Sequence, residues 1–392
     1  MSISRKVEEG VIASSWAVRM FEDQSKTSQV KEICDFRLGN PEIEPPAGFT
    51  ETLKAVVQNS SPGMHRYTPL AGYTETREAV ARALSKESGL PFHTKHIIMT
   101  AGATGALNII FKAILNPGEE VIILAPHFVE YPYYIDNHGG VCTVVETNSD
   151  FTINIDTLAA KITPNTRAIL INNPNNPSGQ VYTGENIKAV AELLSEKSQK
   201  FGRDIFLISD EAYKFITYDN VTLPNISKIY PNTFIAASYS KQLSIPGERI
   251  GYAAANPGIK DIHEVIEALT FANRILGYLS APALMQRVIT HLQETSIDIT
   301  EYTERRNIFC NALEDFGYSF TRPKGTYYIF PKSPTDDLVF TQELAKEGIL
   351  VNPGRNFRRK GYFRIAFCVK KETIEKSLQG FKRVKDRFRS AE

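Results

Sequence analysis

The chain has few cysteines and no long hydrophobic segment. Its four cysteines, at positions 34, 142, 310 and 368, lie far apart and form no Cys-x-x-Cys pair, so neither a zinc site nor a disulfide framework is indicated. No apolar run approaches the roughly 18–20 residues needed to cross a bilayer, and the first residues lack the hydrophobic core of a signal peptide. We therefore expect a reduced, cytoplasmic protein with no metal and no membrane partner.

The chain also lacks an excess of charge of either sign. Its net charge of +1 over 392 residues gives no reason to expect a nucleic-acid partner. The basic runs at residues 355–364 and 382–389 are expected to be solvated surface. The length suits one large domain plus a smaller one.

Residues 75–256 alternate helical and strand patterns. Helical spacing of apolar residues marks 75–88, 105–115 and 185–197. The strand candidates are residues 97–100, 121–124, 141–146, 168–172, 205–209, 233–237 and 250–255. Apolar strands that alternate with helices predict an α/β fold with a mostly parallel seven-stranded sheet covered by helices.

The chain changes character after about residue 295, where a polar helix is followed by short strand candidates. This pattern predicts a smaller α+β domain. We expect a large domain at residues 45–290 and a small domain formed by residues 1–44 and 291–392.

Lys241 lies just beyond the apolar residues 233–237, in Ser238-Tyr239-Ser240-Lys241. A partly desolvated lysine is more readily neutral, and a neutral amine forms a Schiff base with a carbonyl. Ser238 and Arg249 would flank it as a hydroxyl and a fixed cation, which suit a phosphate. An aldehyde and a phosphate together indicate pyridoxal 5'-phosphate (PLP). By itself Lys241 is weak evidence, because a solvated lysine at a strand end is common.

Other strand ends carry chemistry that matches this cofactor, and ligands of open α/β sheets bind at the carboxyl ends of strands. After residues 97–100, Ala103 and Thr104 open a helix whose N-terminal N–H groups suit an anion. After residues 121–124, Phe128 is either a flat ring that stacks on the cofactor or an ordinary core residue.

Two further strand ends offer polar groups for the cofactor ring. Asn176 lies in the rigid turn Asn-Pro-Asn-Asn-Pro-Ser-Gly (173–179) and presents an amide. Asp210 ends a buried strand and needs a partner, because an unpaired buried carboxylate is costly; a protonated pyridine nitrogen is such a partner. Tyr213 would hydrogen-bond the ring's phenolic oxygen. Taken singly, these residues also fit a tight loop and a strand-end turn.

Segments between residues 36 and 367 resemble, in order, the class I/II aminotransferases of PLP fold type I, the group that includes aspartate aminotransferase. The matching segments are Leu38-Gly-Asn-Pro41, Tyr67-Thr-Pro-Leu-Ala-Gly72, Thr76-Arg77-Glu78-Ala79, Asn-Pro-Asn-Asn-Pro-Ser-Gly (173–179), Ser-Asp-Glu-Ala-Tyr (209–213), Ser238-Tyr239-Ser240-Lys241, Arg-Ile-Gly-Tyr (249–252) and Phe363-Arg364-Ile-Ala366. Together these motifs are highly specific and cover most of the chain.

The resemblance implies roles around the cofactor ring. Lys241 would bind the cofactor covalently and act as the base that moves the proton. Asp210 would pair with the pyridine nitrogen, while Asn176 and Tyr213 would bind the phenolic oxygen. Phe128 would stack on the ring. The phosphate would be held by Ala103, Thr104, Ser238 and Arg249.

The resemblance also implies roles in substrate binding and assembly. Arg364 would bind the substrate α-carboxylate in a bidentate fork, helped by Asn176 and the backbone at Gly39. Tyr67 would reach the phosphate of a neighbouring subunit, which implies a homodimer with shared active sites. Arg274 would bind the distal carboxylate of a dicarboxylic substrate across the dimer, unless it lies on a helix face away from the site.

The implied function is a PLP-dependent aminotransferase with ping-pong chemistry, which moves the amino group of an L-amino acid to a 2-oxo acid such as 2-oxoglutarate. The donor would be aspartate or a broader aromatic or aliphatic amino acid. A β-eliminating C–S lyase of the same fold shares every cofactor residue and stays open. A PLP-binding transcriptional regulator is a remote alternative, because it would need an N-terminal DNA-binding domain, and about forty residues precede the first motif.

Overall fold

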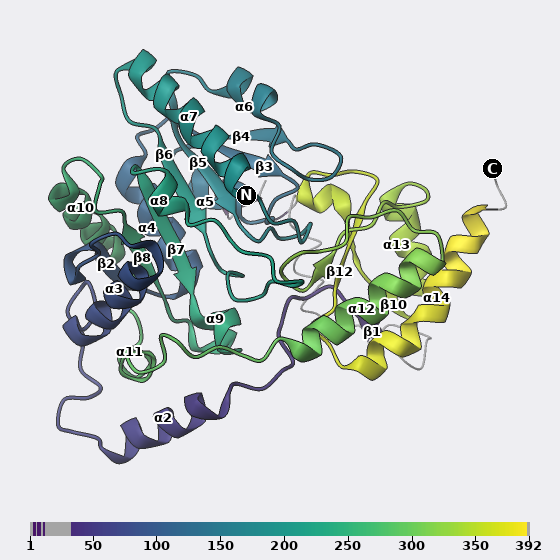
Figure 1. Cartoon of the computed structure of the whole chain (residues 1–392), viewed down its shortest axis with the longest axis horizontal. Helices are drawn as coiled ribbons and strands as arrows, with labels where there is room; N and C mark the ends of the chain where they lie inside the picture. Colours follow the sequence, from purple (N-terminus) through teal and green to yellow (C-terminus); the bar gives the residue numbers. More distant parts are fainter. Residues whose placement is uncertain (1–2, 5, 9–10, 12–32, 390–392) are drawn as a thin grey trace. The chain divides into compact units, whose positions relative to one another are not determined.

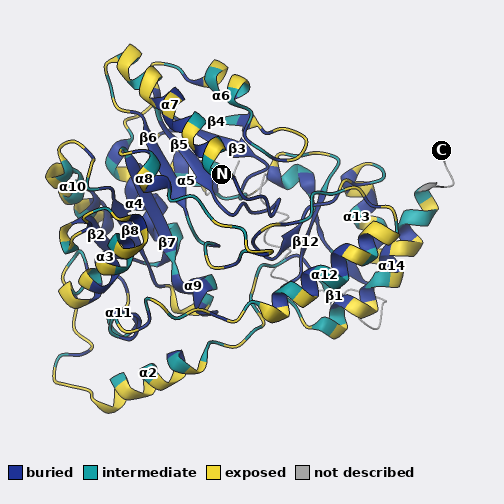
Figure 2. Cartoon of the chain, viewed as in Figure 1, coloured by how far each residue is buried: buried dark blue, intermediate teal, exposed yellow. Residues whose placement is uncertain are grey.

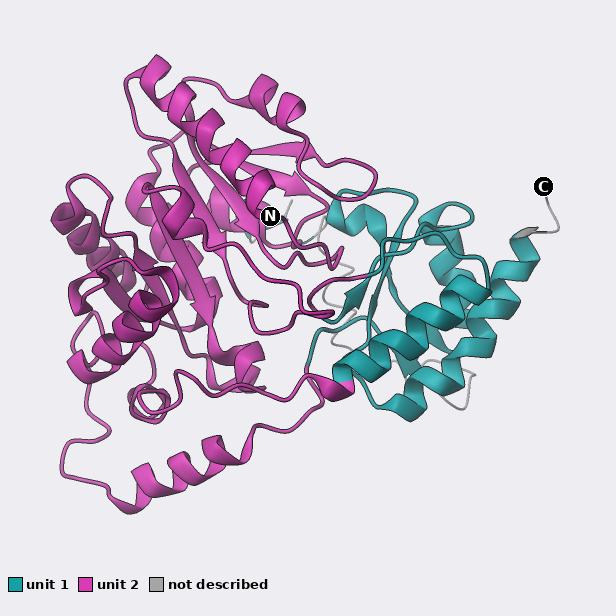
Figure 3. Ribbon diagram, in the orientation of Figure 1, with its two compact units in different colours: residues 1–40, 302–322, 327–392 teal, residues 41–301, 323–326 magenta. Residues whose placement is uncertain are grey.

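The computed structural model describes residues 3–4, 6–8, 11 and 33–389. The chain forms two compact units (Figure 3). The large unit consists of Pro41–Glu301 with Pro323–Thr326, and the small unit of Met1–Asn40, Tyr302–Arg322 and Tyr327–Glu392.

A seven-stranded sheet forms the centre of the large unit (Figure 1). Its strands are β2 (Ile97–Thr100), β3 (Glu120–Ala125), β4 (Val141–Glu146), β5 (Thr166–Asn172), β6 (Phe206–Asp210), β7 (Thr233–Ser238) and β8 (Gly251–Ala255). They lie in the order β2-β8-β7-β6-β5-β3-β4. Only β8 runs against its neighbours; the other pairs are parallel. The predicted mostly parallel seven-stranded sheet is confirmed.

Helices cover both faces of this sheet because its strands are apolar on both sides. Leu170 of β5 packs into a cluster with the side chains of α4, whereas Ile169 and Ile171 pack into a second cluster with those of α7. Figure 2 shows buried strands beneath helices whose outer faces are exposed. The helices of this unit are α2 (Ala47–Gln58), α3 (Thr74–Ser88), α4 (Gly102–Ile114), α5 (Tyr131–Asn137), α6 (Ile155–Lys161), α7 (Gly184–Phe201), α8 (Ile226–Ile229), α9 (Tyr239–Gln242), α10 (Ile262–Ile275) and α11 (Ala283–Ile289).

The small unit combines short strands with three longer helices around an aromatic core. Its elements are β1 (Cys34–Asp35), α12 (Thr300–Asp315), β9 (Tyr328–Ile329), α13 (Asp337–Lys346), β10 (Ile349–Leu350), β11 (Asn352–Pro353), β12 (Phe363–Ala366) and α14 (Lys371–Arg389). Strand β1 pairs with β10, and β12 lies between β11 and β9. The rings of Phe36, Phe309 and Phe381 pack edge to face or tilted against one another. Within the described residues, every helix is too short or too polar to span a bilayer.

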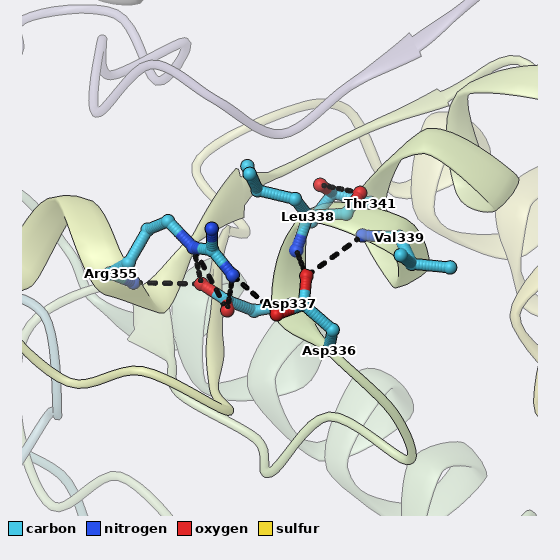
Figure 4. Close-up of polar contacts among 6 residues, drawn as sticks. All are labelled: Asp336, Asp337, Leu338, Val339, Thr341 and Arg355. Atoms are coloured by element: carbon cyan, nitrogen blue, oxygen red, sulfur yellow. Dashed lines mark hydrogen bonds and ion pairs between the residues drawn. The ribbon is translucent and has the colours of Figure 1, made fainter.

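An ion-pair network ties the short 3-10 helix Gly354–Phe357 of the small unit to the start of α13 (Figure 4). Arg355 donates from its backbone N–H (2.9 Å) and from its guanidinium (2.7 Å) to the carboxylate of Asp337, whose side chain is fully buried. Arg355 also forms an ion pair with Asp336 at 2.6 Å. The Asp336 side chain in turn caps α13, because it accepts hydrogen bonds from the N–H groups of residues 338 and 339. The expectation of a solvated basic run at 355–364 is wrong for Arg364, which is 5% exposed, whereas the Arg355 side chain remains 30% exposed.

We predict that Arg355→Met lowers the free energy of unfolding by roughly 3 kcal/mol, because it leaves the buried Asp337 carboxylate without its cation. Loss of the helix cap in Asp336→Ala should cost less, about 1 kcal/mol. Lys346→Met is the matched control, since Lys346 forms an exposed pair with Glu343, and such pairs contribute at most about 1 kcal/mol. Urea denaturation measures all three. Equal effects of Arg355→Met and Lys346→Met would contradict the prediction.

Candidate active site

Five strand ends meet at one edge of the large sheet. Strands β3, β5, β6 and β7 are mutually parallel, and β2 runs in the same direction, so their carboxyl ends lie together. Strand β8 starts at this edge, where Gly251 pairs with both Thr100 and Ser238. The loops that carry the predicted cofactor residues of the large unit therefore share one edge.

Asp210 is a buried carboxylate at the end of β6. It is 6% exposed, and its carboxylate accepts hydrogen bonds from the Tyr131 hydroxyl (2.5 Å) and the Ala212 N–H (3.1 Å). Burial raises the pKa of Asp210 to about 6, although both hydrogen bonds oppose the shift. The described residues thus give this carboxylate a phenol and a backbone N–H, but no cation.

Tyr131 is a site residue that the sequence reasoning missed. Burial and the neighbouring Asp210 carboxylate raise the pKa of Tyr131 well above its usual value, so its hydroxyl stays a donor. Its ring meets Phe128 edge to face, with 5.4 Å between the ring centroids. Phe128 itself is partly buried against the core of the large unit. The available signal was a second aromatic residue three positions after Phe128, at the same strand end.

Asn176 lies in a turn that is stiffened by hydrogen bonds to neighbouring asparagine side chains. Its N–H donates to the Asn172 side chain at 2.7 Å, and the Asn172 amide in turn donates to the Asp210 carbonyl at 3.1 Å. Asn175 accepts from both the N–H and the hydroxyl of Ser178. These bonds connect the asparagine turn directly to the end of β6.

Tyr213 follows Asp210 in a turn that ion pairs of the next residue hold in place. The Tyr213 side chain is 7% exposed and lies close enough to Tyr131 to affect its pKa. Lys214 pairs with Glu87 of α3 at 2.5 Å and with Glu211 at 3.3 Å. The turn that carries Tyr213 is therefore fixed both to the sheet and to a neighbouring helix.

Lys241 lies in the short helix α9, directly after β7. Ser238 caps this helix: its hydroxyl accepts the Ser240 N–H at 3.0 Å and donates to the Ser240 hydroxyl at 2.7 Å. Tyr239 is 1% exposed and donates to Gln293 at 2.8 Å. The helix is thus anchored on one side, while Lys241 is half-buried.

Arg249 lies against the start of α4, where Ala103 and Thr104 are half-buried. A Cβ added to Gly102 would lie 3.2 Å from the Arg249 guanidinium. A Cβ on Gly251 would lie 2.3 Å from the Ala237 carbonyl, so only glycine fits where β8 begins. Arg249 itself has φ +51°, a left-handed conformation that is uncommon for residues other than glycine and that clusters at functional sites. The guanidinium and the N-terminus of α4 form a positive site.

Of the other four predicted residues, two are exposed on the large unit and two belong to the small unit. Tyr67 is 88% exposed, and Arg274 is exposed at the end of α10, with its guanidinium 5.3 Å from the ring centre of Phe271. Gly39 and Arg364 belong to the small unit. There, Arg364 donates to the Arg37 carbonyl at 2.6 Å.

The residues of the large unit fit PLP. The buried Asp210 carboxylate suits a cationic pyridine nitrogen, which would relieve the penalty that raises its pKa. The guanidinium of Arg249 and the start of α4 suit a phosphate. Lys241, at the end of the strand next to β6, supplies the amine that an aldehyde requires.

Comparisons with known proteins agree with this chemistry. The family described as aminotransferase class I and II matches residues 35–381. The chain is 31% identical to the aspartate/prephenate aminotransferase of Thermus thermophilus, over 88% of this chain and 89% of that protein. It is 29% identical to aromatic-amino-acid aminotransferase 2 of Thermococcus litoralis, over 91% and 92%.

The fold comparison gives the same result. A crystal structure of an aminotransferase from Eubacterium rectale matches with a TM-score of 0.95 and 35% identity, and covers 99% of both chains. The expected PLP fold type I is thereby confirmed. The chain belongs to the aminotransferase class I and II family, whose members depend on pyridoxal 5'-phosphate.

Proposed function

We propose that this aminotransferase moves the amino group of an L-amino acid to a 2-oxo acid such as 2-oxoglutarate by a ping-pong mechanism. The observation that carries the proposal is the buried Asp210 carboxylate beside the strand end that presents Lys241. The C–S lyase and regulator alternatives are not favoured, because the relatives are named as aminotransferases. Aspartate and aromatic amino acids are both candidate donors.

We assign the proton transfer to Lys241. When bound, PLP supplies a carbonyl that takes the amino group and a ring that accepts the electrons of the substrate Cα–H bond. Lys241 Nζ would remove the Cα proton and later return it at the cofactor carbon to which the amino group is transferred. Asp210 keeps the ring nitrogen protonated, and this interaction strengthens as negative charge develops. Tyr131 orients the Asp210 carboxylate through its 2.5 Å hydrogen bond.

The remaining residues would hold cofactor and substrate in place. Asn176 and Tyr213 would bind the phenolic oxygen of the cofactor ring, and Phe128 would stack on the face of that ring. Arg364 binds the substrate α-carboxylate in a bidentate fork, supported by Asn176 and the backbone of Gly39. The phosphate is bound by Ala103, Thr104, Ser238 and Arg249, and by Tyr67 of a second subunit.

We propose a homodimer with shared active sites. Its support is the exposure of large side chains that a single chain leaves uncovered: Tyr67 is 88% exposed and Phe271 is 53% exposed. Arg274 lies beside Phe271, and across a dimer it would contact the distal carboxylate of aspartate or glutamate. A cytoplasmic location stays a prediction from the sequence; the four cysteines are free thiols in the structure.

We expect Lys241→Ala to abolish transamination while the protein still folds and binds PLP noncovalently. Borohydride reduction of the cofactor-loaded wild type should attach the cofactor to the peptide that carries Lys241, as peptide mass mapping would detect. Lys112→Ala, at an exposed position of α4, is the matched control and should keep its activity. A reduced cofactor on any other lysine would overturn the assignment.

The buried carboxylate predicts a pH-dependent stability of the cofactor-free protein. The Asp210 carboxyl has a pKa of about 6 when folded, against an ordinary value of 3.8. Between these values the native state holds a proton that the unfolded state has lost, so raising the pH lowers stability. Asp210→Asn should therefore gain stability relative to wild type by about 3 kcal/mol from pH 4 to above pH 6.

Urea denaturation across this pH range measures the effect, with the exposed substitution Asp156→Asn as the control. Added PLP should abolish the pH-dependent difference, because a cation then faces the carboxylate. If the stability difference between Asp210→Asn and wild type did not change with pH in the cofactor-free protein, the raised pKa of Asp210 would be ruled out.

Arg274→Ala tests the donor preference. If Arg274 binds the distal carboxylate of the substrate, the variant's kcat/KM for aspartate should fall by roughly 100-fold, about 2.7 kcal/mol, and its kcat/KM for phenylalanine should change little. Arg82→Ala removes another exposed arginine, one paired with Glu78 on α3, and should affect neither donor. Equal losses for aspartate and phenylalanine would exclude Arg274 from substrate selection.

A further inference from the structure

The guanidinium of Arg364 lies between two aromatic rings of the small unit. Its central carbon is 4.4 Å from the ring centre of Tyr328 and 4.6 Å from that of Phe357. Both rings are buried, as Tyr328 is 3% and Phe357 is 1% exposed. Cations attract the faces of aromatic rings at such distances, most strongly away from water. The two rings therefore limit how the Arg364 side chain can move.

Tyr328 also contacts the second group assigned to the substrate carboxylate. A Cβ added to Gly39 would lie 1.8 Å from the Tyr328 hydroxyl and 2.8 Å from the carbon that bears it. The adjacent Tyr327 donates a hydrogen bond to the Gly39 carbonyl at 2.8 Å. Gly39 is thus fixed by two neighbouring tyrosines, and Tyr328 occupies the space that any side chain at position 39 would need.

The backbone connects these groups as well. Strand β12 carries Arg364 and pairs with β9, which carries Tyr328. The carbonyl of Arg37, two residues before Gly39, accepts from Arg364 at 2.6 Å and from the Asn352 amide at 2.8 Å. Arg364, Tyr328 and the segment at Gly39 therefore form one packed group within the small unit.

We propose that Tyr328 is a positioning residue for substrate carboxylate recognition: its ring holds Arg364, and its phenol end packs against Gly39 and leaves no room for a side chain there. The inference rests on the proposed binding of the α-carboxylate by Arg364 and Gly39. A flexible arginine loses side-chain freedom when it forms a two-point contact with a carboxylate, and a guanidinium fixed in advance loses less. Tyr328 provides this fixation without touching the substrate.

Two aminooxy compounds test the proposal on the PLP-loaded enzyme. Aminooxyacetate and O-methylhydroxylamine both attack the cofactor carbon that forms the Schiff base with Lys241, give an oxime there and release the lysine amine, which absorbance follows directly, but only aminooxyacetate carries a carboxylate. Tyr328→Leu should slow the reaction with aminooxyacetate at least tenfold and leave the reaction with O-methylhydroxylamine within twofold of wild type. For an amino-acid donor, KM should rise more than kcat falls. Tyr328→Phe keeps the ring and should stay within about threefold for both compounds.

The controls separate this inference from the proposed function. Arg364→Met should lose the same preference for aminooxyacetate; if it does not, the carboxylate role of Arg364 is wrong. If Arg364→Met loses the preference and Tyr328→Leu keeps it, only the role of Tyr328 is overturned. Tyr362→Leu is the matched control, since Tyr362 stacks on Phe330 in the same unit, and it should leave the preference unchanged.

A second pair of variants keeps the test valid if Tyr328→Leu does not fold. Gly39→Ala should reduce the preference for aminooxyacetate, because the new methyl group displaces the Tyr328 hydroxyl. In the Tyr328→Phe background the same change should cost at least threefold less, since the closest clashing atom is gone. Equal costs of Gly39→Ala in both backgrounds would overturn the coupling between Tyr328 and Gly39.

Discussion

A buried carboxylate at the end of a central strand is the constraint around which the large unit is organised. Asp210 is 6% exposed, and burial raises its pKa to about 6. Such a group destabilises a fold unless other groups meet its charge. Tyr131 and the Ala212 N–H meet part of it, and the Asn172 amide fixes the adjacent backbone carbonyl. The remaining demand is for a cation, which the ring nitrogen of the cofactor would supply in the function proposed above.

The opposite charge is collected along the same edge of the sheet. Arg249, in a left-handed conformation, brings its guanidinium against the N-terminus of α4, and Ser238 ends the neighbouring strand. One edge of the sheet thus offers a negative group and a positive group, which match the cationic ring and the anionic phosphate of a single cofactor. Parallel strands make this possible, because they deliver the ends of separate sequence segments to one side.

The small unit meets a different requirement, since it buries an arginine side chain. Arg364 is 5% exposed and lies between Tyr328 and Phe357. A guanidinium tolerates burial better than an ammonium, because it is weakly hydrated and stacks on rings. Arg355 shows the other solution in the same unit, since it pairs with the buried carboxylate of Asp337.

The sequence by itself determined the strands, their alternation with helices and the family, because apolar runs and short rigid motifs are local signals. Asp210 and Lys241 were singled out as candidates in this way, since Asp210 ends an apolar strand and Lys241 comes three residues after another. The strand order and the contacts of Tyr131 with Asp210 and of Tyr328 with Arg364 were decided only by the tertiary structure. The physical reason is that these contacts join segments far apart in the chain, and packing, which no local pattern records, brings them together.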